Sequence, residues 1–178
     1  MPSDEEVIRL IQNFSRTQIF EEKLTSAGRK YHDYRQSWKE ILESEARRSL
    51  SEEQIASETL RRIQNHVMSI FTQIVVEKPI TSRDIGAAFD LWNPSTQTAI
   101  EICLGAIKNE FEKDVLKAML DHDVKKLIIM IREYKTGRSE TIYGLRWFEH
   151  PYQKGVLELV KNFKLDIDVV SLFPSTSE

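Results

Sequence analysis

The sequence predicts an α/β protein with a mixed central sheet flanked by helices. Two observations support this fold class. Apolar side chains follow a helical spacing through the first seventy residues, and from residue 72 onward short β-branched or apolar runs alternate with helical segments. Hydrophobic residues make up 40% of the 178 residues, which is enough for a globular domain with a core.

The N-terminal part of the chain is expected to be helical. The spacing of a capping box, which opens a helix, occurs twice: Ser3 with Glu6 and Ser51 with Gln54. A break near residues 25–28 separates the first helix from a second one, expected from about residue 30 to 48. We therefore expect three parts: an N-terminal helical extension (1–50), an α/β core (51–173) and a polar tail (174–178).

The core is expected to run helix, three strands, helix, strand, helix, strand. The strands are expected at 72–76, 87–92, 98–104, 126–131 and 167–172, and the later helices at 106–121 and 152–163. Residues 93–97 have the composition of a hairpin loop, so the first three strands should form a meander. The last two strands follow helical crossovers and should therefore join the sheet in parallel.

Composition excludes several classes of protein. The net charge of −3 gives no overall basic signature, although a local basic face remains compatible with it. A single cysteine rules out an internal disulfide and suits a reducing, cytoplasmic location. The acidic N-terminus does not resemble a signal peptide, and no apolar run is long enough for a membrane span. The four histidines lack zinc-ligand spacing, and there is no phosphate-binding glycine loop.

Two acidic residues stand out in the expected meander. Glu101 lies inside the apolar run "TAIEICLG", and Asp90 ends the preceding run. With the loop centred near residue 95, Asp90 should lie almost opposite Glu101, with Glu101 and Cys103 on one face. Two facing carboxylates need a cation between them or a shared proton, and Mg²⁺ is commonly held by one or two carboxylates. The alternative is that Glu101 faces solvent or a lysine, and that Asp90 only opens the turn.

The stretch "AAFDLWNPSTQTAIEICLG" resembles the PD-(D/E)XK nuclease superfamily, over roughly residues 51–172. The resemblance implies a restriction endonuclease-like core and a DNA endonuclease that depends on Mg²⁺ or Mn²⁺. By the same resemblance, Asp90 and Glu101 would bind the metal ion that activates water for phosphodiester hydrolysis and stabilises charge on the phosphate. A third acid would come from the first core helix, with Glu52 as the first choice and Glu45 as an alternative.

The sequence departs from the family where the motif lysine is expected, because position 103 is cysteine. A thiol supplies no fixed ammonium and is a poor ligand for a hard cation. Three interpretations follow: the catalytic site works without the lysine, a lysine comes from the next helix, or only binding remains. Lys108, Lys113 and Lys117 are the possible replacements, of which we take Lys113 as the catalytic candidate. Cys103 itself could simply pack as a small apolar residue.

Nucleic-acid contacts are expected from the long polar segment after residue 131, where Lys135, Arg138 and Arg146 stand near Trp147. A solvated hairpin is the alternative. Cleavage of both DNA strands needs two active sites, so a homodimer is expected. The rival functions are a catalytically inactive nuclease fold that binds nucleic acid or assembles with protein, and a small α/β protein that binds another protein.

Overall fold

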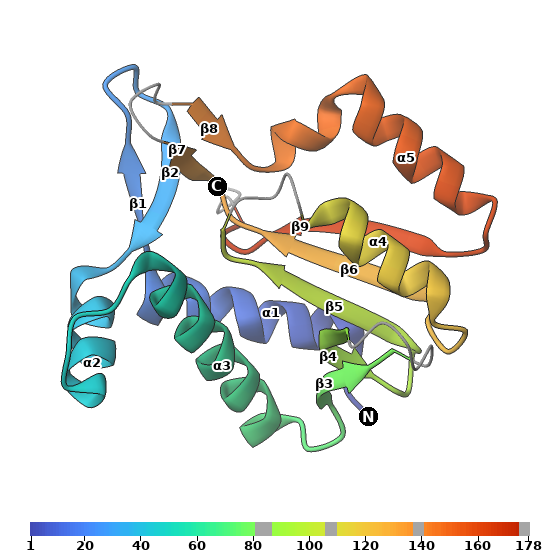
Figure 1. Ribbon diagram of the computed structural model, residues 1–178, viewed down its shortest axis with the longest axis horizontal. Helices are drawn as coiled ribbons and strands as arrows, with labels where there is room; N and C mark the ends of the chain where they lie inside the picture. The colour runs from blue at the N-terminus through green and yellow to red at the C-terminus, as the bar shows by residue number, and fades with distance from the viewer. Residues whose placement is uncertain (81–86, 106–109, 137–140, 175–178) are drawn as a thin grey trace.

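The computed structural model describes residues 1–80, 87–105, 110–136 and 141–174. Its centre is a five-stranded mixed sheet with the strand order β3-β4-β5-β6-β9 (Figure 1). The strands are β3 (Val75–Pro79), β4 (Ala88–Asn93), β5 (Thr98–Cys103), β6 (Lys126–Ile131) and β9 (Asp166–Ser171). The first three strands pair antiparallel, and β6 and β9 are added in parallel. The predicted α/β class with a mixed sheet, including the antiparallel meander and the parallel later strands, is therefore confirmed.

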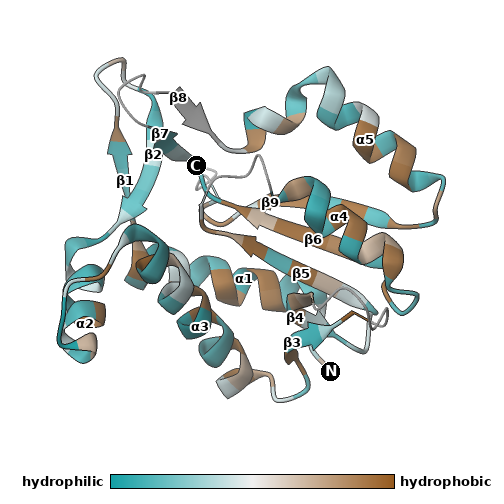
Figure 2. Ribbon diagram, viewed as in Figure 1, coloured by the Kyte–Doolittle hydropathy of each residue, from teal (hydrophilic) through white to brown (hydrophobic). Residues whose placement is uncertain are grey.

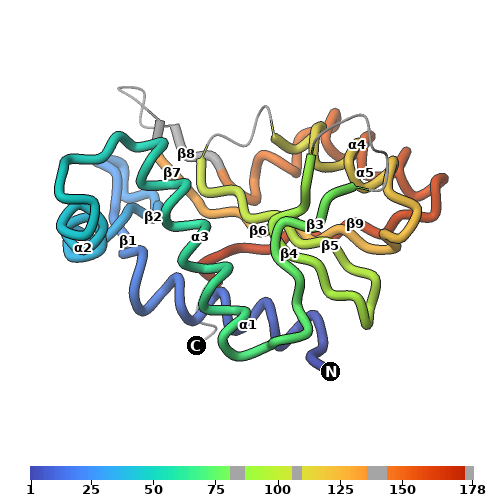
Figure 3. Tube along the Cα trace, turned by 60° about the horizontal axis from the view of Figure 1, so that its bottom comes forward, coloured from blue at the N-terminus to red at the C-terminus, as the bar shows by residue number. Residues whose placement is uncertain are grey.

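Helices cover both faces of this sheet. Figure 3 shows α1 (Asp4–Phe14) on one side, and α4 (Phe111–Leu120) and α5 (Pro151–Lys161) on the other. Helix α3 (Glu52–Ile70) packs with α1, and α2 (Gln36–Ala46) packs against α3. Both predicted capping boxes are present, at Ser3 and Ser51.

The sheet separates two hydrophobic clusters. One joins α1 and α3 to the sheet through Val7, Ile63, Ile100 and Ile128. The other packs α4 and α5 on the opposite face, and Cys103 belongs to it. Every residue of β5 is buried, and Figure 2 shows apolar residues along the central strands. Glu101 therefore lies in the middle of the sheet, where an acidic side chain needs a partner.

The prediction of a helix over residues 30–48 is wrong for its first part. Lys30–Tyr34 is strand β2, which pairs with β1 (Phe20–Leu24) across the predicted break, where Gly28 has a φ of 73°. The aromatic residues of this stretch fit both a helical and a strand spacing. Tertiary pairing decided the outcome, because His32 donates its backbone N–H to the carbonyl oxygen of Glu133 at 2.7 Å. The first fifty residues are thus not wholly helical.

The N-terminal helix is also part of the main core. Val7 and Ile11 of α1 have no exposed surface, and they pack in the same cluster as Ile100 of the central strand. Residues 1–14 therefore help to form the domain rather than standing apart from it.

The segment after β6 contains more regular structure than a polar loop. It forms a short hairpin, β7 (Tyr134–Thr136) with β8 (Thr141–Tyr143), followed by the 3-10 turn Leu145–Glu149. Strand β7 lies beside β2 at the carboxyl ends of β5 and β6 (Figure 1). None of the helices in the described ranges has the length and apolar character that crossing a bilayer requires.

Candidate functional site

Strand β4 leaves β5 at Asp90. The paired register runs through Leu91 opposite Ile100, and one step further it places Asp90 opposite Glu101. At this position the side chain of Asp90, and not its backbone, accepts the hydrogen bond from β5. Ile102 donates its N–H to Oδ2 of Asp90 at 2.8 Å. Gln64 of α3 donates to the carbonyl oxygen of Asp90 at 3.0 Å. Both acidic residues line a cavity at this point, although Glu101 itself is only 4% exposed.

Lysine 117 reaches Glu101 from the other layer of the fold. Its Nζ forms an ion pair with Oε1 of Glu101 and a second one with Oδ1 of Asp114 at 2.8 Å. It also donates to the carbonyl oxygen of Ala88 at 3.2 Å. Asp114 and Lys117 are three residues apart on α4, so one helical turn presents both to the sheet. The Lys117 side chain is only 9% exposed.

The cluster of Asp90, Glu101, Asp114 and Lys117 holds three carboxyl groups and one ammonium. Burial, followed by the charges of Asp90 and Asp114, raises the pKa of Glu101 well above its ordinary value. Burial also raises the pKa of Asp90, despite hydrogen bonds from Ile102 and Glu101, and it raises that of Asp114 to about 6. The cluster thus favours an additional proton or cation.

Lys117 binds its proton more tightly than an ordinary lysine does. Burial alone would lower its pKa, but the charges and hydrogen bonds of Glu101 and Asp114 together raise it above the ordinary lysine value. Lys117 therefore remains an ammonium at neutral pH, which suits charge stabilisation rather than proton removal.

This cluster lines a cavity of about 630 Å³, which we call the acidic cleft. Its walls come from α3, β4, β5 and α4, and they include Glu53, Ala56, Gly105 and Lys113. The volume falls within the range of about 300–1,000 Å³ that is usual for ligand sites.

The structure distinguishes the three candidate lysines. Lys117 contacts Glu101, whereas Lys113 lies at the rim of the acidic cleft, with its side chain 63% exposed and 3.9 Å from Glu110. Lys108 lies outside the described residues. The contact between a helix lysine and Glu101 is thus made by Lys117, one turn beyond our first choice.

Cys103 is placed as a packing residue. Its side chain is buried in the cluster with Phe111 and Ala118, and its Sγ is 4.0 Å from Oδ2 of Asp114. Burial and the nearby acids raise the pKa of the thiol well above its ordinary value, so a reactive thiolate is disfavoured.

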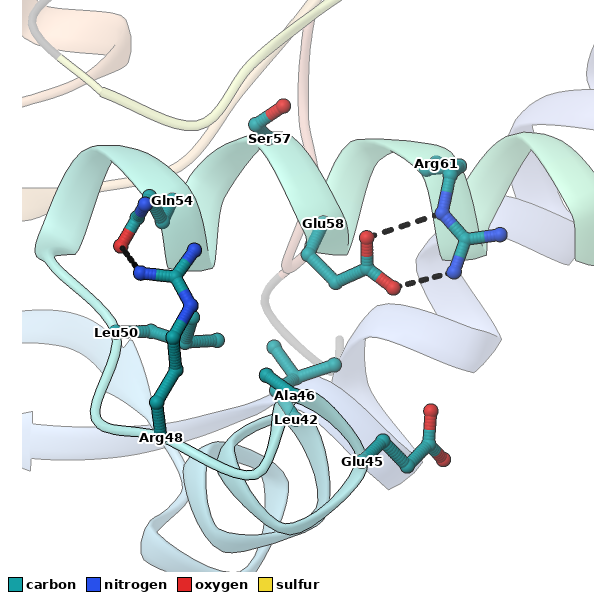
Figure 4. Close-up of a pocket in the computed structure, with 9 residues that line it drawn as sticks. All are labelled: Leu42, Glu45, Ala46, Arg48, Leu50, Gln54, Ser57, Glu58 and Arg61. Atoms are coloured by element: carbon teal, nitrogen blue, oxygen red, sulfur yellow. Dashed lines mark hydrogen bonds and ion pairs between the residues drawn. The ribbon is translucent and has the colours of Figure 1, made fainter.

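The two candidates for a third acid lie away from the cluster. Glu52 is exposed and lines a neighbouring cavity, while the adjacent Glu53 lines the acidic cleft itself. Glu45 lies on α2, in the groove between α2 and α3 where Glu58 and Arg61 also face (Figure 4), and it pairs with Arg62. The buried third acid is instead Asp114.

Asp114 was absent from our candidates, although a signal for it exists. Phe111, Asp114, Val115 and Ala118 have the spacing i, i+3, i+4 and i+7 of a buried helix face, and all four are buried. A charged residue on such a face needs a buried partner, which points to a site.

The expected nucleic-acid residues are spread around the β7–β8 hairpin. Lys135 lies 5.7 Å from the ring of Tyr31, and Arg146 is exposed on the 3-10 turn. Trp147 packs edge-to-face on Phe111 and Phe148 and so is only partly open to solvent. Arg138 lies outside the described residues.

The donor set of the acidic cleft suits a hard cation held in part by water. In the described part of the chain, no group of three or more His, Cys, Asp or Glu residues has the geometry to hold a metal ion. Two carboxylates with water and a substrate phosphate are, however, a usual arrangement for Mg²⁺. Asp90 and Glu101 offer such a pair, and burial raises the pKa of both carboxyl groups, so a bound cation would stabilise their charged forms.

Comparisons with protein-family models, with curated proteins and with solved structures found no match to this chain.

Proposed function

We propose that this protein is a divalent-metal-dependent DNA endonuclease with a restriction endonuclease-like core. The observation that carries the proposal is the acidic cluster itself: carboxyl groups from β4, β5 and α4 converge with one lysine at the edge of a cavity. Buried like charges are costly, and proteins retain them mainly where they serve a chemical purpose.

Asp90 and Glu101 are the residues that would hold Mg²⁺ or Mn²⁺. When bound, such an ion polarises the phosphate and activates water for hydrolysis. A cation on Glu101 would compete with Lys117 for this carboxylate, and the role of the Lys117 ammonium would be to stabilise charge on the scissile phosphate. Lys117 would thereby replace the motif lysine that is absent at Cys103. Asp114, at 2.8 Å, keeps Lys117 directed at the cleft.

The test is cleavage of supercoiled plasmid with Mg²⁺ or Mn²⁺. We expect cleavage by the wild type and none by Glu101→Gln or Asp90→Asn. Lys117→Met should reduce the rate on the order of 100- to 1,000-fold, as the loss of one charge-stabilising donor does. Lys113→Met is the matched control and should retain the wild-type rate, because that lysine lies at the rim. Undiminished cleavage by Glu101→Gln would contradict the site.

Metal binding can be measured apart from cleavage. An ion that binds only the folded state at 100 times its Kd raises the free energy of unfolding by about 2.7 kcal/mol. We therefore expect Mn²⁺ to raise the Tm of the wild type at pH 7.5, and not that of Asp90→Asn. The effect should shrink as the pH falls, because burial raises the pKa of both proposed ligands and protons then compete with the ion for them.

A nuclease-fold module that binds nucleic acid without cleaving it is the second candidate. The contact of Lys117 with Glu101 favours it, because this ion pair by itself compensates the charge of the acid. DNA binding without cleavage, together with an unchanged Tm in Mn²⁺, would support this candidate over the first.

A homodimer is part of the endonuclease proposal. Cleavage of both strands needs two active sites, and two copies related by symmetry supply them. Light scattering of the protein with and without DNA measures the assembly directly.

A further inference from the structure

A second cavity adjoins the acidic cleft. It encloses about 750 Å³ between β2, the first turn of α3 and the β6–β7 connection, and we call it the arginine cavity after Arg132. Both cavities are lined by Glu53, Ala56, Leu104 and Gly105, so they meet at the carboxyl end of β5.

Arg132 is a half-buried cation without a carboxylate partner in the described ranges. It donates from Nε to the carbonyl oxygen of Leu104 and from Nη1 to that of His32, both at 2.8 Å. Its Nη2 amino group has no acceptor among the described residues. Its guanidinium carbon lies 4.8 Å from the ring centre of Tyr34 and 5.1 Å from that of Phe20.

These contacts position the guanidinium but do not neutralise it. Carbonyl oxygens and aromatic faces satisfy part of an arginine, whereas a charge removed from water is best compensated by an anion. Asp33, next to His32 on β2, is a possible anionic partner, but its carboxylate already forms an ion pair with Lys23 at 3.1 Å. His32 itself adds no charge at pH 7, because burial lowers its pKa to about 4.

The surroundings favour an anion that carries an aromatic group. Tyr31 and Tyr134 line the same cavity as Arg132, together with the cationic Lys39 and Lys135. Planar bases stack on such rings, and arginine binds phosphate oxygens through two parallel hydrogen bonds. Glu52 and Glu53 lie on the α3 side of the cavity, which disfavours an anion there and directs it toward Arg132.

We propose that the arginine cavity binds a nucleotide, with its phosphate on Arg132 and its base against the tyrosine rings. The ligand is either a free nucleotide or one unit of a single strand, since both present the same phosphate and base. This binding needs neither a metal ion nor Glu101, so it can be tested independently of the proposed cleavage.

The experiment is an NMR titration of the wild-type chain in EDTA with 5′-dAMP, deoxyadenosine, inorganic phosphate and a short oligodeoxynucleotide. We expect 5′-dAMP or the oligonucleotide to shift the backbone amide signals of residues 31–34 and 104. Phosphate alone should bind more weakly, and deoxyadenosine should produce no saturable shift. Saturation by 5′-dAMP assigns a free nucleotide, and saturation by the oligonucleotide alone assigns a strand. No saturation by either one overturns the proposal.

Variants test the role of the guanidinium. Arg132→Lys keeps the charge but loses the planar fork, and we expect it to weaken binding at least about tenfold. Arg132→Met should abolish binding, while Arg61→Met, on the exposed face of α3, should leave it unchanged. Circular dichroism establishes that each variant is folded. Equal affinity of wild type and Arg132→Lys, or equal shifts with deoxyadenosine, overturns the assignment even if Arg132→Met fails to fold.

Discussion

The acidic cleft and the arginine cavity place charge inside the same fold in opposite ways. In the cleft, three carboxyl groups share the single ammonium of Lys117, so the site lacks positive charge. In the arginine cavity, the guanidinium of Arg132 meets carbonyl oxygens and rings, and no carboxylate of the described residues pairs with it. The acidic cleft and the arginine cavity are both lined by Leu104 and Gly105.

This difference suggests how one ligand could satisfy both cavities. In the two proposals, a metal ion would compensate the carboxylates of the cleft, and a phosphate would compensate the guanidinium beside it. A nucleic-acid strand carries its phosphates at regular intervals together with their cations, so it can supply both. The proposed cleavage and the proposed nucleotide binding are therefore complementary, although each has its own test.

The largest expected effect is on stability at the cleft. Removing one member of a buried ion pair costs about 3–5 kcal/mol, so Lys117→Met should lose this much free energy of unfolding at pH 8. The loss should be smaller at pH 5, because burial raises the pKa of Asp114 to about 6 and its protonated carboxyl group needs no cation.

Denaturant unfolding at both pH values measures the effect of Lys117→Met. Lys113→Met is the control on the same helix, and as an exposed substitution it should change the free energy of unfolding by no more than about 0.5 kcal/mol. Equal losses for the two variants would show that the comparison between the cavities is wrong.

The next effect concerns the pH dependence of the cleft. The pKa of Asp114 is raised to about 6 by burial, so the folded state holds its proton more tightly than the unfolded state does. Its stability contribution is therefore complete below about pH 4 and is lost as the pH rises through 6. The free energy of unfolding of Asp114→Asn, taken relative to that of the wild type, should accordingly rise by on the order of 2–3 kcal/mol from pH 4 to pH 7.

His32 contributes a pH dependence of stability opposite to that of Asp114, and comparing Asp114→Asn with the wild type removes it. The pKa of His32 is lowered by burial to about 4, and its stabilising effect is lost as the pH falls toward that value. His32 is present in both proteins, so its effect cancels in the difference. A difference that does not vary from pH 4 to pH 7 would show that Asp114 titrates normally.

The smallest expected effect lies in the arginine cavity. Arg132→Met leaves the carbonyl oxygens of Leu104 and His32 without their donor, which costs about 1–3 kcal/mol. Thermal unfolding of this variant beside Arg61→Met measures the cost. A loss as large as that of Lys117→Met would mean that Arg132 is as essential to the fold as the buried ion pair.

Local sequence patterns determined much of this protein. The capping boxes at Ser3 and Ser51, the apolar run of β6 and the hairpin between β4 and β5 all follow from spacing within a few residues. The alternation of side chains in β5 likewise placed Glu101 and Cys103 on one face, because that period is a property of every strand. These features needed no knowledge of distant residues.

Tertiary structure decided the rest. Residues 30–34 became a strand because β2 found partners in β1 and in Glu133, which lies a hundred residues further along the chain. Lys117 rather than Lys113 reached Glu101, because the packing of α4 on the sheet brings one helical turn, and not the turn before it, next to Glu101. Arg132 became a half-buried cation only when β2, β5 and β6 met around it. In each case a contact between residues far apart in the sequence, and not the local pattern, decided the arrangement.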